Sequence, residues 1–106
     1  MMTEATIQRI TTRIVERFRP VRIVLFGSYA RGEADENSDL DLLVVLDSPP
    51  PRGRRSAPIV RFLAEQFTLP IDVVVRSRES VERYGNTAGT LVAEALREGV
   101  VLYERG

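Results

Sequence analysis

Two apolar runs joined by a short polar stretch occupy residues 23–46 and constrain the fold more than any other part of the sequence. The first run ends at Gly27 and Ser28, and the second opens with Asp39 and Asp41, one residue apart. Because successive side chains of a strand point to opposite faces, the two aspartates are predicted to share one face. They would lie about 6–7 Å apart along the strand, a spacing that suits a pair of divalent cations.

Gly27 and Ser28 indicate an anion site at the end of the first run. Glycine lets the backbone come close to a bound group, and Ser28 adds a hydroxyl where a following helix would direct free N–H groups at an anion. The alternative is a simple turn, with the two aspartates as solvated residues. The apolar run after Asp41 looks buried on both faces. A charge at the beginning of such a strand costs several kcal/mol unless it is paired or metal-bound. This favours a site for a metal-bound phosphate.

The same residues resemble the signature of the nucleotidyltransferase superfamily of DNA polymerase beta. That signature is an apolar residue, Gly, Gly or Ser, a spacer, and then Asp-x-Asp or Asp-x-Glu. Here it is Phe26-Gly27-Ser28, ten residues, and Asp39-Leu40-Asp41. The longer string from Gly27 to Gly32 is most similar to the minimal nucleotidyltransferases, stand-alone catalytic domains of which many are the antitoxin partner of a HEPN-domain toxin.

This resemblance implies a reaction and a set of ligands. It implies ATP as the donor, AMP as the transferred group, two Mg²⁺ ions, and a hydroxyl acceptor, expected to be a tyrosine of a partner HEPN toxin. It also places Gly27, Ser28 and Arg31 among the nucleotide-binding residues. Arg31 follows Ser28 by three residues and is the candidate to reach a phosphate, although a surface arginine without a role is the alternative.

The composition excludes several kinds of chemistry. The 106 residues are enough for one domain, spanning 1–106, and the formal net charge of zero argues against nucleic-acid binding through charge alone. The sequence has no cysteine and no histidine, so a general base must be a carboxylate, a tyrosine or water. All fifteen basic residues are arginine, which excludes a Walker-type lysine. No apolar run approaches a membrane span, and we expect a cytoplasmic protein with no membrane association.

Periodicity and turn residues predict the order of elements along the chain. The predicted elements are a helix over 4–18, a strand over 21–26, a short helix from Ser28 toward Gly32, a strand over 39–46, a helix capped by Ser56 with a buried stripe of Ile59, Val60, Leu63 and Phe67, a strand over 71–75, a helix around 91–96 stopped by Gly99, and a short strand over 100–103. Residues 76–86 stay unassigned, and the segment 47–55, with its arginines, is predicted to be a solvated loop.

The predicted site also constrains the topology. Ser28 follows the end of the first strand, whereas Asp39 and Asp41 open the second, so these two strands must run antiparallel to converge. Asp72 opens the third strand, which must then run parallel to the second, through a crossover helix. The prediction is an α/β or α+β domain with a small mixed sheet flanked by helices.

Asp72 completes the predicted catalytic set. Asp39 and Asp41 would hold both metal ions, and Asp72 would ligate one of them or accept the proton of the acceptor hydroxyl. The alternative is a buried aspartate paired with an arginine. Two other functions stay open: a non-catalytic antitoxin that neutralises its partner by binding, and a small-molecule nucleotidyltransferase completed by a partner subunit. Three carboxylates in one place argue against a pure binding module.

Overall fold

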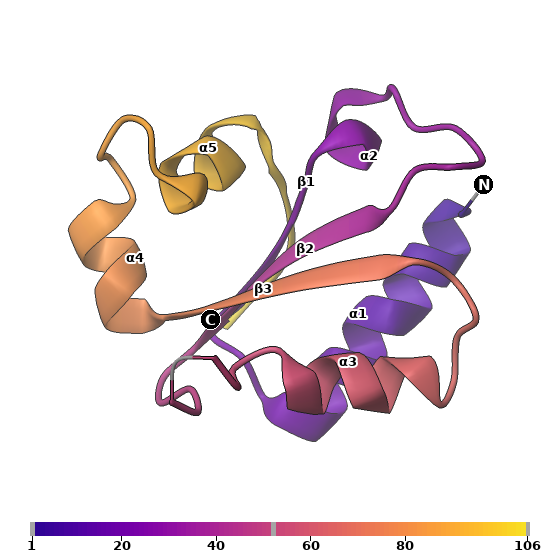
Figure 1. Cartoon of the computed structure of the whole chain (residues 1–106), viewed down its shortest axis with the longest axis horizontal. Helices are drawn as coiled ribbons and strands as arrows, with labels where there is room; N and C mark the ends of the chain where they lie inside the picture. The colour runs from indigo at the N-terminus through magenta and orange to yellow at the C-terminus, as the bar shows by residue number, and fades with distance from the viewer. Residues whose placement is uncertain (1, 52, 106) are drawn as a thin grey trace.

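The computed structural model describes residues 2–51 and 53–105 (Figure 1). Its elements are α1 (Glu4–Phe18), β1 (Arg22–Phe26), α2 (Ser28–Arg31), β2 (Leu40–Leu46), α3 (Ala57–Ala64), β3 (Ile71–Ser77), α4 (Arg78–Tyr84), α5 (Leu91–Glu98) and β4 (Val100–Glu104). The strands form one mixed sheet in the order β3-β2-β1-β4. Helices α1 and α3 cover one face of this sheet, and α4 and α5 cover the other (Figure 1). The predicted fold class is confirmed.

The strand directions agree with those that the site required. β1 is antiparallel to β2, and β2 is parallel to β3. β4 adds an antiparallel strand at the outer edge of β1. In this register Asp41 of β2 lies opposite Phe26 of β1 on one side and opposite Asp72 of β3 on the other. The end of β1 and the beginnings of β2 and β3 therefore meet at one edge of the sheet.

β2 is the central strand of the core, and five of its seven residues are buried. Leu42 and Val44 pack toward α1 and α3, where Ile10, Ile14 and Ile59 complete the larger apolar cluster. Leu43 and Val45 belong to the smaller cluster on the opposite face, which includes Val24 and Ala95. Asp41 alternates with Leu42, so its side chain lies on the α4–α5 face. The prediction that this strand is buried on both faces is confirmed.

The helix after the proline-rich segment differs from its prediction in two details. Ser56 is the N-cap residue of α3, as predicted, but its backbone angles are helical and its side chain makes no capping hydrogen bond. Val60 is 40% exposed, and the buried residues of α3 are Ile59 and Leu63. Phe67 is buried, although it lies beyond the end of the helix.

The unassigned segment 76–86 contains the end of β3 and all of α4. The hydroxyl of Ser77 accepts a hydrogen bond of 3.0 Å from the backbone N–H of Ser80 and caps this helix. In the proline-rich loop, Arg52 lies outside the described residues, so the predicted solvation of its side chain stays a prediction. Among the described residues, no helix is long and apolar enough to cross a membrane.

Candidate active site

Gly27 lies at the centre of the candidate site. Its backbone conformation and the close approach of Asp41 both require glycine at this position. Its φ of +74° is in the region that side chains rarely adopt. A Cβ added there would lie 2.2 Å from the Oδ2 atom of Asp41. The Asp41 carboxylate is therefore packed directly against the backbone of Gly27. This contact brings together the two halves of the sequence motif, as predicted.

Asp41 is the carboxylate whose environment is most perturbed. Burial raises the pKa of the Asp41 carboxyl above its ordinary value, and the negative charges of Asp72 and Asp39 raise it further. The positive charge of Arg31 opposes this shift, and Glu98 adds a smaller increase in the same direction as the aspartates. A half-buried carboxylate among other acidic groups is stabilised when a cation binds beside it.

Asp72, on the neighbouring strand, and Asp39, two residues earlier in the chain, are both more exposed than Asp41. Asp72 occupies the second position of β3, directly opposite Asp41 in the parallel ladder. The alternative of a buried Asp72 paired with an arginine is wrong, because Asp72 is exposed. Asp39 precedes β2, at the end of a loop in which Asp35 and Ser38 hydrogen-bond to each other.

The three aspartates do not form one compact cluster. Within residues 2–51 and 53–105, no group of three acidic side chains converges closely enough to hold a metal ion. The structure thus places Asp41 beside Asp72 but does not draw all three predicted metal ligands together. Mg²⁺ commonly keeps several waters and uses only one or two protein carboxylates together with substrate phosphates. The oxygen donors of Asp41 and Asp72 fit such an ion.

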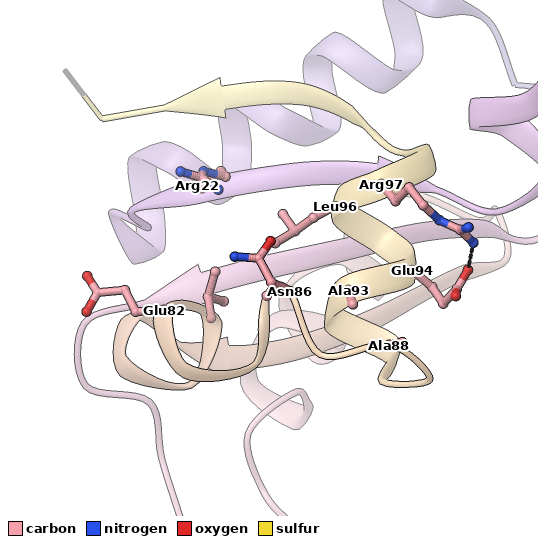
Figure 2. Close-up of a pocket in the computed structure, with 10 residues that line it drawn as sticks. Arg22, Glu82, Asn86, Ala88, Ala93, Glu94, Leu96 and Arg97 are labelled. Atoms are coloured by element: carbon pink, nitrogen blue, oxygen red, sulfur yellow. Dashed lines mark hydrogen bonds and ion pairs between the residues drawn. The ribbon is translucent and has the colours of Figure 1, made fainter.

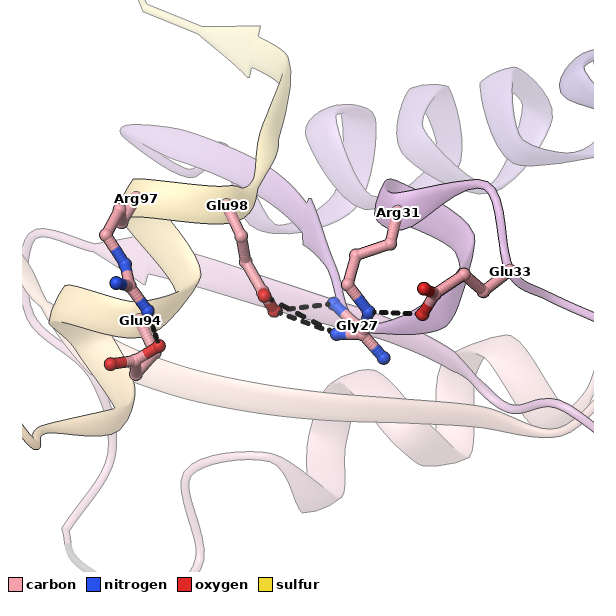
Figure 3. A network of polar contacts seen from close by, with 6 residues as sticks. All are labelled: Gly27, Arg31, Glu33, Glu94, Arg97 and Glu98. Carbon is pink, nitrogen blue, oxygen red and sulfur yellow. Dashed lines mark hydrogen bonds and ion pairs between the residues drawn. The ribbon is translucent and has the colours of Figure 1, made fainter.

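Ser28 and Arg31 begin and end α2, the single helical turn that follows Gly27. The Nε atom of Arg31 donates a hydrogen bond of 2.7 Å to Glu33. Its Nη1 atom donates to both carboxylate oxygens of Glu98, at 3.3 and 3.4 Å (Figure 3). The backbone N–H of Gly27 also donates to Glu98, at 3.3 Å. Arg31 and Gly27 thus share the Glu98 carboxylate, and this carboxylate already accepts hydrogen bonds from the Arg31 guanidinium.

Sequence reasoning did not identify Glu98. It is the last residue of α5, immediately before the predicted stop at Gly99. The carbonyl end of a helix carries partial negative charge, so an acidic residue there is unfavourable for the helix itself. That mismatch is the signal in the sequence that could have pointed to a role for Glu98 outside the helix.

A cavity of the described residues lies elsewhere. It has a volume of about 650 Å³ and lies between α4 and α5, with Arg22, Asn86 and Leu96 among its lining residues (Figure 2). None of the predicted site residues lines it. Arg97 and Glu94 also line this cavity and form an ion pair with each other (Figure 2). The candidate site is thus the open edge of the sheet at Gly27 and Asp41, separate from this cavity.

Comparison with protein families agrees with this geometry. The model of the nucleotidyltransferase domain family matches residues 7–101, which include every residue of the candidate site. The chain belongs to the nucleotidyltransferase domain family. The resemblance drawn from the Gly-Ser and Asp-x-Asp motifs is therefore confirmed at the level of the family, and the prediction of a nucleotidyltransferase with it.

Two curated proteins share part of the sequence of this nucleotidyltransferase domain. Protein adenylyltransferase MntA of Thermococcus cleftensis is 36% identical over 81 residues, which cover 73% of this chain and 81% of the relative. A candidate protein adenylyltransferase of Methanocaldococcus jannaschii is 37% identical over 54 residues, which cover 51% of this chain. The matched part spans 52% of that relative's own length.

Two solved structures share the fold of the nucleotidyltransferase domain. One is a toxin–antitoxin complex with AMP-PNP, with a TM-score of 0.66 and 21% identity over 92% of this chain and 73% of that one. The other is a variant of the toxin–antitoxin MntA-HpeT, with a TM-score of 0.61 and 22% identity over 99% of this chain and 75% of that one. At these identities the likeness establishes the fold, which agrees with the sheet and helices described above.

Proposed function

We propose that this chain transfers AMP from ATP to a hydroxyl of a partner protein and so acts as the antitoxin of a toxin–antitoxin pair. The observation that carries the proposal is the packing of the Asp41 carboxylate against Gly27, with Asp72 beside it in the ladder. The matched relatives that are named protein adenylyltransferases support the choice of adenylyl transfer. The toxin–antitoxin neighbours support a toxin as the partner.

The proposed reaction is a displacement at the α-phosphorus of ATP. The acceptor oxygen forms a new bond to this phosphorus, the bond from the phosphorus to the bridging oxygen of the β-phosphate breaks, and pyrophosphate leaves. The proton of the acceptor hydroxyl passes to Asp72, the exposed carboxylate beside Asp41. The backbone N–H of Gly27, the hydroxyl of Ser28 and the guanidinium of Arg31 bind and orient the triphosphate.

Asp39, Asp41 and Asp72 are the residues that would hold the two proposed Mg²⁺ ions. The pKa of the Asp41 carboxyl, raised by burial and by neighbouring acidic groups, fits a site that gains stability when a cation binds. Magnesium in such sites neutralises phosphate charge and makes a hydroxyl easier to deprotonate. Of the three aspartates, Asp41 is the one in contact with the glycine turn, so it would be the metal ligand nearest the proposed phosphate-binding groups.

The partner is proposed to be a HEPN-domain toxin and the acceptor one of its tyrosines, as the resemblance to minimal nucleotidyltransferases implies. A helical protein with an Arg-x4–6-His motif, encoded in the adjacent reading frame, would fit this role.

Incubation of both proteins with labelled ATP and magnesium, followed by intact-mass measurement of each chain, tests the proposal. We expect the mass of the toxin to increase by one or more AMP groups, and the increase to require magnesium. A toxin that is neutralised without any change in mass would instead support a non-catalytic antitoxin. Label found only on a small molecule would support a nucleotidyltransferase completed by its partner subunit.

A further inference from the structure

The carboxylate of Glu98 occupies the hydrogen-bond donors that the proposed function assigns to the triphosphate. It accepts from the backbone N–H of Gly27 at 3.3 Å and from Nη1 of Arg31 through both of its oxygens. Carboxylate and phosphate oxygens use the same donors with similar geometry, and a guanidinium binds either group. A phosphate and Glu98 therefore cannot use these two donors at the same time.

The backbone fixes Glu98 in this place. The next residue, Gly99, passes so close to β1 that a Cβ there would lie 2.4 Å from Cγ1 of Val24 and 2.9 Å from the carbonyl oxygen of Leu25. This contact places the end of α5 against the last residues of β1, and Leu25 is two residues from Gly27. Figure 3 shows the Glu98 side chain reaching from α5 toward Arg31 of α2, while Glu94 and Arg97 pair with each other one turn earlier.

The pair is accessible enough to open. The Arg31 side chain is 44% exposed and that of Glu98 is 29% exposed. An ion pair at this exposure contributes little to stability, and a ligand that carries several negative charges can replace it. Arg31 also keeps its second partner, Glu33, on the Nε side, so its guanidinium stays at the site when Glu98 moves away.

We infer that Glu98 is a specificity-determining residue that competes with phosphate for Gly27 and Arg31, an inference that rests on the proposed function. Ligands with a triphosphate displace Glu98 and bind. A ligand without phosphate makes no use of these donors and is indifferent to Glu98. The charge of Glu98 thus lowers the affinity for triphosphate while leaving the affinity for the nucleoside part unchanged.

The test is calorimetric titration of the wild-type chain, Glu98→Gln and Glu94→Gln with magnesium–ATP, inorganic tripolyphosphate and adenosine. Gln has the size of Glu but lacks its charge, and Glu94 is a matched control because it lies on the same helix and pairs with Arg97. We expect Glu98→Gln to bind ATP and tripolyphosphate about two- to tenfold more tightly, the range expected for one released, partly exposed ion pair. Glu94→Gln should match the wild type, and adenosine should bind all three chains alike.

Three outcomes would overturn the inference. If ATP binds the wild type but Glu98→Gln binds it equally or more weakly, Glu98 is not a competitor, and the proposed function is unaffected. If adenosine gains as much as ATP, the change is not specific to phosphate. If no chain binds ATP or tripolyphosphate, the proposed function itself fails, and the inference fails with it. Thermal melting of each variant confirms that the comparison is made between folded proteins.

Discussion

The two ends of β2 carry aspartates in opposite electrostatic environments. Asp41, at the beginning of the strand, is half-buried among other acidic groups, and the pKa of its carboxyl is raised. Asp47, just past the other end, accepts a hydrogen bond of 2.7 Å from Arg105 and forms an ion pair of 3.3 Å with Arg78. The hydrogen bond from Arg105 lowers the pKa of the Asp47 carboxyl, with a further contribution from Arg78.

This difference separates a carboxylate that serves the fold from one that serves a ligand. At Asp47 the chain supplies the positive charges itself. The ion pairs of Asp47 with Arg78 and Arg105 connect the start of α4 and the segment after β4 to the end of β2. At Asp41 the nearest arginine, Arg31, is already paired with Glu33 and Glu98. The site end of the strand therefore keeps an excess of negative charge that a bound cation would neutralise.

The largest expected effect is on catalysis at the Asp41 end. Asp41→Ala or Asp39→Ala should reduce AMP transfer by on the order of 10³-fold or more, because a lost metal ligand removes several kcal/mol of transition-state stabilisation. Asp47→Ala is the control from the opposite end of the strand and should transfer AMP at the wild-type rate. The measurement is single-turnover transfer with magnesium. Near-normal transfer by Asp41→Ala or Asp39→Ala would contradict the proposal that the substituted aspartate is a metal ligand.

Asp72→Asn sharpens the comparison within the site by separating chemistry from binding. Asn keeps the size of the side chain but cannot accept the proton, so transfer should fall by about 10²–10⁴-fold while the affinity for ATP changes little. Because Asp72 is exposed, the free energy of unfolding should stay within about 0.5 kcal/mol of the wild type. ATP titration, thermal melting and single-turnover transfer on one preparation check all three expectations. A variant that melts early would show that Asp72 supports the fold instead.

Ser28→Ala tests the glycine turn beside Asp41. The loss of one hydrogen bond to a charged phosphate should weaken ATP binding by about 1.5–3 kcal/mol, with little change in melting temperature. Ser80→Ala is a suitable control, since Ser80 is also half-buried but lies on α4. Nucleotide titration of the two variants measures the difference. Equal affinities in both would mean that Ser28 only shapes the turn.

The smallest expected effects are on stability. Substitutions of the aspartates at the two ends of β2 should change the melting temperature in opposite directions. The folded-state pKa of Asp41 is raised, so its ionisation opposes folding once the pH exceeds the unfolded-state value of about 3.9. Asp41→Asn should therefore raise the melting temperature of the metal-free chain at neutral pH, and this gain should vanish as the pH falls toward that value.

Asp47 should show the opposite dependence, because its folded-state pKa is lowered. Its ionised form supports the fold above about pH 3.9, and this support disappears as the pH falls through the folded-state value. Asp47→Asn should thus lower the melting temperature at neutral pH, by an amount that shrinks on acidification. Melting curves of both variants between pH 3 and 8 would contradict the comparison if the two shifts had the same sign.

Sequence alone determined the motif, the fold class and the directions of the first three strands. Local patterns are sufficient for these features. Alternation places Asp39 and Asp41 on one face, and Gly27 and Ser28 terminate a strand. The requirement that Ser28, Asp41 and Asp72 lie at one edge of the sheet leaves one arrangement of the strands. The bounds of α1 agree with the prediction for the same reason, since its apolar spacing and Pro20 are local signals.

Tertiary structure decided which groups are near one another when they are distant in the chain. Glu98 is 67 residues from Arg31, and only the close packing of Gly99 on β1 brings its carboxylate to the phosphate donors. The contrast between Asp41 and Asp47 has the same origin, because Arg105 and Arg78 reach Asp47 through the placement of β4 and α4. The charge of a side chain can be seen in the sequence, but its partners depend on how the elements pack, and partners set its pKa and its role.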